Sequence, residues 1–175
     1  FTRPAWRREL EEKLDPVSPG LYRFGGVSFV LGTEVSCVYK QGGRSRRVHM
    51  LLFAPDFATV AELYTAFSKV GAKLESAGRP TLPMSARDLT ALALDINHQC
   101  MVIPAHVWTP WFGLFGSKSG FDSLEECFLD MSPHIHAIET GLSSDPAMNW
   151  RVTSLDEVSV VSFSDAHSLP KLGRE

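Results

Sequence analysis

The sequence alternates between short apolar, β-branched runs and segments with helical periodicity, and this alternation is what most constrains the fold. The β-rich runs occupy residues 26–40, 46–55, 99–107, 134–141 and 158–165, and the helical patterns occupy 5–14, 56–70, 86–97 and 121–131. Asp56 and Ser85 precede two of these patterns as candidate N-caps. The glycine-containing segment QGGRS between the first two runs indicates a hairpin or a pair of neighbouring strands. Strands alternating with helices predict an α/β fold with a mainly parallel sheet or a barrel.

Composition limits the classes of protein that the chain can represent. The chain has 175 residues, with 44% hydrophobic and 21% charged side chains, which suits one globular domain. Its net charge of −3 argues against a generally basic protein that coats nucleic acid. No run reaches the roughly 18 to 20 apolar residues of a membrane helix, and the 3 cysteines lack the CxxC spacing of a zinc ribbon. We therefore expect a cytoplasmic, nucleoid-associated protein with no membrane partner.

Polar side chains fall at or near the ends of the apolar runs. Glu34, His106, Glu139 and the pair Asp165 and His167 follow such runs, and His49 lies within one. In parallel α/β folds the carboxyl ends of the strands meet at one rim, so these groups would converge there. Each one alone has an ordinary structural interpretation, such as a hydrogen-bonded core histidine or a helix cap.

Together these side chains indicate a metal site. Buried carboxylates and imidazoles are costly without partners, and a metal cluster satisfies several of them at once. Mixed nitrogen and oxygen ligands suit zinc, manganese or iron. Two or three such ions lower the pKa of a bridging water and hold a phosphate during displacement. Phosphoester hydrolysis is the predicted class of reaction.

The residues Glu34, His49 and His106 and the S-D-A-H motif at 164–167 resemble the polymerase and histidinol phosphatase (PHP) superfamily, whose fold is a distorted (β/α)7 barrel. Within that superfamily the chain is similar to the endonuclease Q family of DNA-repair nucleases, which nick DNA 5′ to deaminated bases and abasic sites. The similarity is carried by the segments TEVSCVYKQGGRSRRVHMLL, IPAHVWTPWFGLFGSKSGFDSLEE, IETGLSSDPAMNW and SFSDAHSLPKLGRE.

The resemblance implies a set of ligands and partners. It implies two or three divalent ions (zinc, manganese or magnesium), with metal ligands Glu34, His49, His106, Asp165 and His167. The implied catalytic residues are Glu34, His49, Asp165 and His167. DNA with deaminated or abasic lesions is the implied substrate, with replication or repair factors as further partners. Residues 1–175 would form a partial barrel domain truncated at both ends, because the HxH strand and the Gly-Thr-Gly-Asp strand that open the family pattern are absent from it. The metal site of this piece would then be incomplete, and activity of the piece alone is not expected.

A loop rich in Trp, Phe and Gly follows His106 and is a candidate base pocket. A nuclease that acts beside a damaged base turns that nucleotide out of the stack, and aromatic rings can then receive it. The alternative is that these rings only pack the loop onto the fold. Basic residues between Glu34 and His49 would meet phosphates, and Arg46 and Arg47 share that segment. The predicted substrate-binding residues are Lys40, Arg44, Trp108, Trp111, Gly113, Phe115, Ser117, Lys118, Glu139, Ser143, Ser144 and Asn149.

Two other functions remain open from the sequence. The same barrel could serve a small-molecule phosphatase, as it does in histidinol phosphatases, or a non-catalytic PHP-like domain that binds DNA. The aromatic loop and the basic segment at 40–47 favour the nuclease over the phosphatase, because a small phosphate ester needs neither.

Overall fold

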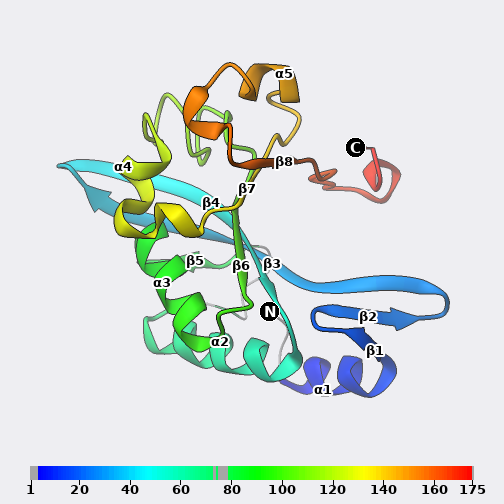
Figure 1. Cartoon of the computed structure of the whole chain (residues 1–175). Helices are drawn as coiled ribbons and strands as arrows, with labels where there is room; N and C mark the ends of the chain where they lie inside the picture. Colours follow the sequence, from blue (N-terminus) through cyan, green and yellow to red (C-terminus); the bar gives the residue numbers. More distant parts are fainter. Residues whose placement is uncertain (1–3, 73, 75–78, 175) are drawn as a thin grey trace.

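A computed structural model describes residues 4–72, 74 and 79–174 of the chain. The helices are α1 (Pro4–Lys13), α2 (Phe57–Lys69), α3 (Ala86–Ile96), α4 (Leu124–Phe128) and α5 (Pro146–Asn149), with 3-10 turns η1 (Leu129–His134), η2 (Thr153–Leu155) and η3 (Leu169–Lys171). The strands are β1 (Asp15–Ser18), β2 (Leu21–Phe24), β3 (Val27–Gln41), β4 (Arg44–Ala54), β5 (Thr81–Leu82), β6 (Met101–Pro104), β7 (Ala137–Glu139) and β8 (Ser159–Val161). Figure 1 shows their arrangement.

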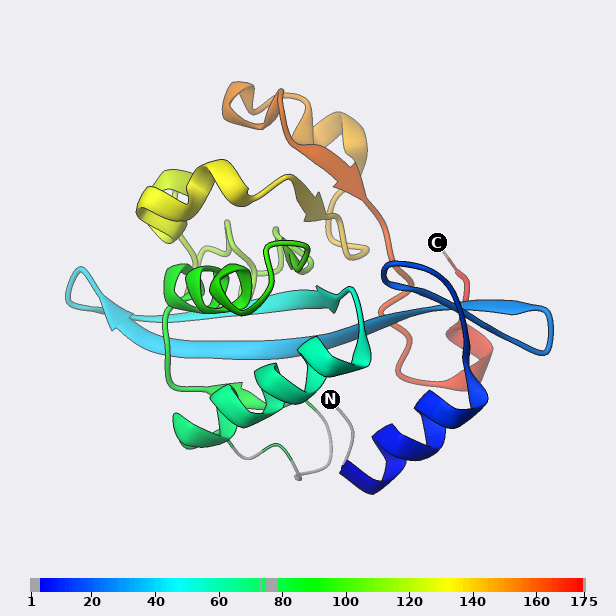
Figure 2. The same ribbon diagram turned by 60° about the horizontal axis from the view of Figure 1, so that its bottom comes forward.

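The long hairpin of β3 and β4 is the backbone of the fold. The two strands pair antiparallel from Leu31 opposite Ala54 to Gln41 opposite Arg44, and β4 pairs antiparallel with β6. β1, β2 and β3 form an antiparallel meander, whereas β5 joins β3 and β8 joins β7 in parallel. Figure 2 shows the hairpin crossing the molecule, with α3 above it and α2 below it in this view.

The prediction of an α/β fold is therefore confirmed, but the prediction of a mainly parallel sheet is wrong, and the described strands do not close into a barrel. The reason lies in the turn. Gly42 and Gly43 adopt φ angles of 58° and 74°, which glycine tolerates and which reverse the chain within two residues. A parallel pair would need a crossover of a dozen or more residues at that point.

One face of the hairpin forms the core with the helices. Because side chains alternate along a strand, Val35 and Cys37 of β3 and Val48 and Met50 of β4 share this face, and each is fully buried. They belong to the same cluster as buried residues of α2, α3 and α4, namely Leu63, Phe67, Leu89, Ala93 and Phe128. The opposite face is left for Glu34, Ser36, Arg47 and His49.

The helix starts follow their sequence signals. The Asp56 carboxylate accepts a hydrogen bond from the Thr59 N–H at 2.7 Å, and the Ser85 hydroxyl accepts one from the Asp88 N–H at 3.0 Å. Both are N-caps of the kind predicted. Among the described residues no helix combines the length and apolarity that crossing a membrane requires.

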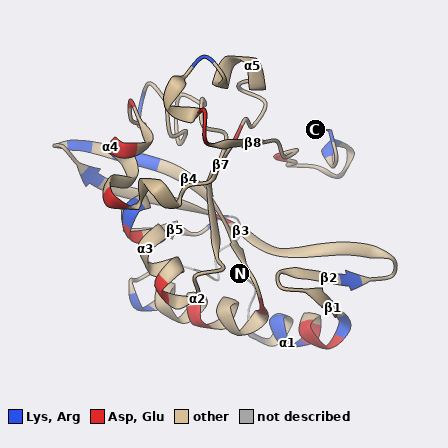
Figure 3. Cartoon of the chain, in the orientation of Figure 1, with Lys and Arg blue, Asp and Glu red and all other residues tan. Residues whose placement is uncertain are grey.

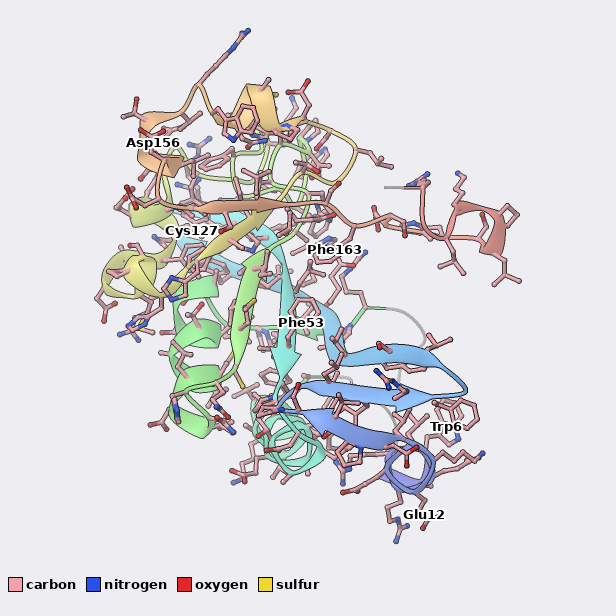
Figure 4. The ribbon with its side chains drawn as sticks, turned by 45° about the vertical axis from the view of Figure 1, so that its right-hand side comes forward. Trp6, Glu12, Phe53, Cys127, Asp156 and Phe163 are labelled. Carbon is pink, nitrogen blue, oxygen red and sulfur yellow. The ribbon has the colours of Figure 1, made fainter. Side chains whose placement is uncertain are left out.

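The meander of β1 and β2 was not predicted. Its residues are largely exposed, so they carry no alternation of buried and exposed side chains that the sequence could show. Figure 4 shows this end of the molecule, where Trp6 of α1 lies beside the meander, and the middle of the molecule, where Phe163 after β8 lies near Phe53. The Phe163 ring lies 6.2 Å from that of Phe53 on β4, so the segment after β8 returns to the hairpin.

Candidate metal centre and adjoining cleft

Glu34 and His49 meet because of the register of the hairpin. Glu34 is paired with Leu51 and His49 with Ser36, so the two side chains are diagonal neighbours on the same face. The Nδ1 atom of His49 lies 3.1 Å from Oε1 of Glu34. A strand position that looks like the end of an apolar run in the sequence is thus the middle of a long strand.

His106 joins them from the end of β6. Its Nε2 atom lies 3.4 Å from Oε1 of Glu34 and 3.0 Å from Nδ1 of His49. Its Nδ1 atom lies 2.9 Å from the hydroxyl of Thr109, a contact that fixes the orientation of the ring. When Nδ1 carries the proton and donates it to this hydroxyl, Nε2 presents a lone pair toward Glu34. Thr109 was not recognised from the sequence.

The three side chains fit a divalent metal ion. One donor atom from each lies within 4.8 Å of the others. Oε1 of Glu34 is buried and makes no contact with hydrogen-bond geometry among the described residues, but it is ion-paired with Nε of Arg79 at 2.8 Å. Two imidazoles and a carboxylate are a ligand set that zinc and manganese accept.

The electrostatics keep Glu34 ionised. Burial alone would raise its pKa, but the imidazoles of His106 and His49 and the guanidinium of Arg79 outweigh burial, and the pKa falls well below its ordinary value. Burial lowers the pKa of His49, which favours the neutral imidazole that metals bind. For His106 burial acts in the same direction, but the carboxylate of Glu34 outweighs it and raises the pKa.

Glu139 supports His106 from behind. It is 2% exposed, and its Oε2 atom accepts a hydrogen bond from the backbone N–H of His106 at 2.6 Å. Its backbone carbonyl accepts another from Val107 at 3.0 Å. Burial raises the pKa of Glu139, partly offset by the His106 N–H. Glu139, which the sequence predicted to contact substrate, thus accepts a hydrogen bond from the backbone of His106, a candidate metal ligand.

Asp165 and His167 lie outside this cluster of three. The Asp165 side chain is 33% exposed and that of His167 is 74% exposed, with His167 Nδ1 3.8 Å from an Asp165 carboxylate oxygen. Asp165 is near enough to Glu139 for its charge to contribute to the raised pKa of that residue. The structure therefore brings together Glu34, His49 and His106, and a ligand role for Asp165 and His167 stays a prediction.

The aromatic loop after His106 continues the hydrogen bonding along the edge of β4, past the end of β6. The N–H of His49 donates to the carbonyl of Phe112 at 2.9 Å, and the N–H of Arg47 donates to that of Ser119 at 3.2 Å. The Phe112 ring stacks on His49 with 4.3 Å between centroids. At Gly113 a Cβ atom would lie 2.5 Å from the carbonyl oxygen of Thr109, so the compact loop requires glycine there.

Several predicted substrate contacts are internal supports of this loop. The Trp108 ring packs against that of Phe115 with 4.9 Å between centroids and a tilt of 39°, and its indole N–H donates to Oδ1 of Asn149 at 2.8 Å. Asn149 is fully buried, and its amide nitrogen donates to the hydroxyl of Ser144 at 3.1 Å. The hydroxyls of Ser143 and Ser144 donate to the carbonyl of Thr140 at 3.2 and 3.3 Å. Trp111, Ser117 and Lys118 are exposed, Trp111 by 52%, and these remain candidates for contact with a ligand.

The basic residues of the hairpin divide between its two faces. Lys40 and Arg47 lie on the face of Glu34, whereas Arg44 and Arg46 lie on the other. Arg46 is buried, donates to the carbonyl of Gly120 and to Glu126, and stacks on the Phe121 ring. Figure 3 shows basic residues along this end of the hairpin. Arg46 thus stabilises the fold, and Arg44 stays an exposed position on the face away from Glu34.

Arg79 is the charged group at the site that sequence reasoning missed. Its Nε atom lies 2.8 Å from Oε1 of Glu34, outside hydrogen-bond geometry. It lies just before β5, whose pairing with β3 brings it to the metal centre. A cleft of about 270 Å³ opens there, lined by Ser36, Val38, Arg47, His49, Arg79, Thr81 and Phe112. No local signal marks Arg79, because its position depends on that strand pairing.

Comparison with known proteins identifies solved structures of the same fold. No protein-family model matches the sequence. The novel lesion-specific endonuclease PfuEndoQ from Pyrococcus furiosus matches with a TM-score of 0.79 and 31% identity over 98% of this chain and 40% of that chain. Endonuclease Q in complex with a 27-mer duplex substrate, with an abasic lesion at the active site, matches with a TM-score of 0.79 and 30% identity, with the same coverage.

A curated protein of similar sequence is uncharacterized protein YqxK of Bacillus subtilis (strain 168). It is 32% identical over 177 residues, which cover 95% of this chain and 42% of that protein. The chain thus spans about two fifths of the length of the proteins it matches. It has an endonuclease Q-like fold.

Proposed function

We propose that this chain carries part of the active site of a metal-dependent DNA endonuclease that nicks DNA 5′ to deaminated bases or abasic sites. The observation that carries the proposal is the convergence of Glu34, His49 and His106 beside a cleft with two arginines. The fold around this site is similar to that of an endonuclease crystallised with an abasic duplex. We also propose that the whole protein has a PHP-type barrel. It would act on DNA in the cytoplasm, together with replication or repair factors.

The proposed roles follow from the geometry. Glu34, His49 and His106 would hold a zinc, manganese or magnesium ion, and Asp165 and His167 are proposed as further ligands. A bound divalent ion supplies an activated water and neutralises charge on the phosphoryl group. Thr109 and Glu139 orient His106 through its ring and its backbone. Trp111, exposed at the edge of the cleft-side loop, is the proposed stacking surface for a displaced base.

The test is a cleavage assay on defined lesions. The full-length protein that contains this chain is incubated with Mn²⁺, Mg²⁺ or Zn²⁺ and end-labelled duplexes that contain uracil, hypoxanthine or an abasic site, beside an undamaged duplex and histidinol phosphate. We expect a nick 5′ to the lesion that EDTA abolishes. Glu34→Gln should lower the rate by at least about 100-fold, because loss of a group that merely supports a ligand already costs about 10- to 100-fold.

The control is Glu62→Gln, which removes an exposed carboxylate of α2 away from the cluster and should leave the rate unchanged. Hydrolysis of histidinol phosphate alone would instead identify a small-molecule phosphatase. Lesion binding by the full-length protein without cleavage under any of the three metals would identify a non-catalytic DNA-binding domain.

A further inference from the structure

The cleft beside the metal centre is formed by three strands and a loop. Thr81 on β5 is paired with Ser36 on β3, and Ser36 is paired with His49 on β4, so the three side chains form a row across one face of the sheet. Arg79 and Arg47 flank this row, and Phe112 closes it from the loop. The cleft volume of about 270 Å³ is larger than a single ordered water requires.

The lining of this cleft has the chemistry of an anion site. Two guanidinium groups provide fixed positive charge and planar sets of N–H donors, which suit the oxygens of a phosphate. The hydroxyls of Ser36 and Thr81 can add neutral donors from the floor. Val38 and Phe112 contribute apolar surface beside these donors.

The two arginines are in different electrostatic states. Arg79 is paired with Glu34 at 2.8 Å, so part of its charge is already balanced. The guanidinium carbon of Arg47 lies 5.7 Å from the Trp111 ring centroid and 5.9 Å from that of Phe112. In the part of the chain that the structure describes, Arg47 forms no salt bridge with a carboxylate. Arg47 should therefore contribute more than Arg79 to binding of an anion in the absence of metal.

We propose that this cleft binds a single phosphate group of a DNA backbone immediately beside the metal centre, between Arg47 and Arg79. The identification of DNA as the source of the phosphate rests on the proposed function, whereas the phosphate-binding cleft itself does not. The residues of the cleft fix the register of the strand relative to Glu34, and they read no base.

The test uses inorganic phosphate and DNA in parallel, both in EDTA so that no cleavage occurs. Phosphate is compared with chloride at equal ionic strength, and the melting temperature of the protein is recorded. We expect phosphate to raise the Tm of the wild-type protein saturably, and Arg47→Gln combined with Arg79→Gln to abolish the rise. Thr81→Val, which keeps the shape of the side chain and all charges, should reduce it. Lys69→Gln at the end of α2 is the control that removes one positive charge outside the cleft, and it should behave as wild type.

Binding of an abasic duplex is then followed by fluorescence anisotropy at several salt concentrations. Arg47→Gln should reduce the slope of log K against log salt by about 0.9, the value for one neutralised phosphate. The proposal that the cleft binds phosphate would be rejected if phosphate shifted the Tm of the wild type and the double variant equally. It would also be rejected if phosphate did not shift the Tm of the wild type. If the double variant lost the phosphate-induced shift in Tm but the wild type did not bind the duplex, the phosphate-binding cleft would stand and the proposed function would be rejected.

Discussion

At the scale of single residues, the metal centre depends on close packing behind His106. His106 has a φ angle of 32°, and Gly141 has a φ angle of 58°. A Cβ atom built on Gly141 would overlap the Cβ atom of His106. Glycine at position 141 is therefore needed for two reasons, its backbone conformation and the proximity of the ligand candidate.

Gly141→Ala should both destabilise the protein and weaken metal binding. The left-handed conformation alone costs a non-glycine residue about 1 to 2 kcal/mol, and the overlap with His106 adds about 1 to 3 kcal/mol of strain. Gly42→Ala is the matched control, because Gly42 has the same φ of 58° and open space around it. Urea unfolding measures the loss of stability in each variant, and competition with a chromophoric chelator measures metal affinity. Equal losses in both variants, with metal affinity unchanged, would show that the overlap has no consequence.

Residue by residue, the sequence revealed part of this site. Glu34, His49 and His106 could be found because each interrupts an apolar run, where an ionisable side chain is costly without a partner. Arg79 and Thr109 lie in irregular segments where polar residues are expected, so nothing local distinguishes them. Asn149 and Ser144 were predicted to bind substrate because the sequence does not show that their side chains form hydrogen bonds within the protein.

At the scale of secondary-structure elements, the hairpin and the helices were predictable, but the direction of the sheet was not. The glycine turn and the caps are local signals, read within a few residues. The choice between parallel and antiparallel neighbours for β4 and β6 depends on where the chain between them runs, and α2 and α3 fit either arrangement. β6 is buried from Val102 to Pro104, but it pairs antiparallel with β4.

Arg46 links the hairpin to the aromatic loop and α4, so its replacement should cost stability without touching the metal centre. Its guanidinium bonds to Gly120 and Glu126 and covers the Phe121 ring at 4.0 Å. Arg46→Met should lower the free energy of unfolding by about 2 to 3 kcal/mol. This is at or below the low end of the range of about 3 to 5 kcal/mol for breaking a buried pair, because Glu126 remains partly in water.

Arg44→Met removes an exposed arginine from the same strand face and should change the free energy of unfolding by less than about 0.5 kcal/mol. Urea titration of both variants at neutral pH makes the comparison. If the two variants lost the same stability, the contacts of Arg46 with the loop and α4 would contribute nothing net.

At the scale of the whole molecule, the candidate metal centre connects segments that lie far apart in the sequence. Glu34 comes from β3, His49 from β4 and His106 from the end of β6, and Glu139 ties the end of β7 to His106. The smaller sheet of β7 and β8 thus contacts the larger one at the site itself. An ion bound by Glu34, His49 and His106 would link β3, β4 and the end of β6 in the native state, and the unfolded chain does not bring these ligands together.

Binding of a divalent ion should therefore raise the thermal stability of the whole chain. At free metal 100 times the dissociation constant, binding to the native state alone adds about 2.7 kcal/mol. For a chain of this length that corresponds to a rise in Tm of roughly 5 to 10 °C, measured by calorimetry in Zn²⁺ or Mn²⁺ and reversed by EDTA. His49→Gln should remove the rise, whereas His134→Gln, at an exposed position of η1, should keep it. A rise of the same size in His49→Gln would place the bound ion somewhere other than between β3, β4 and β6.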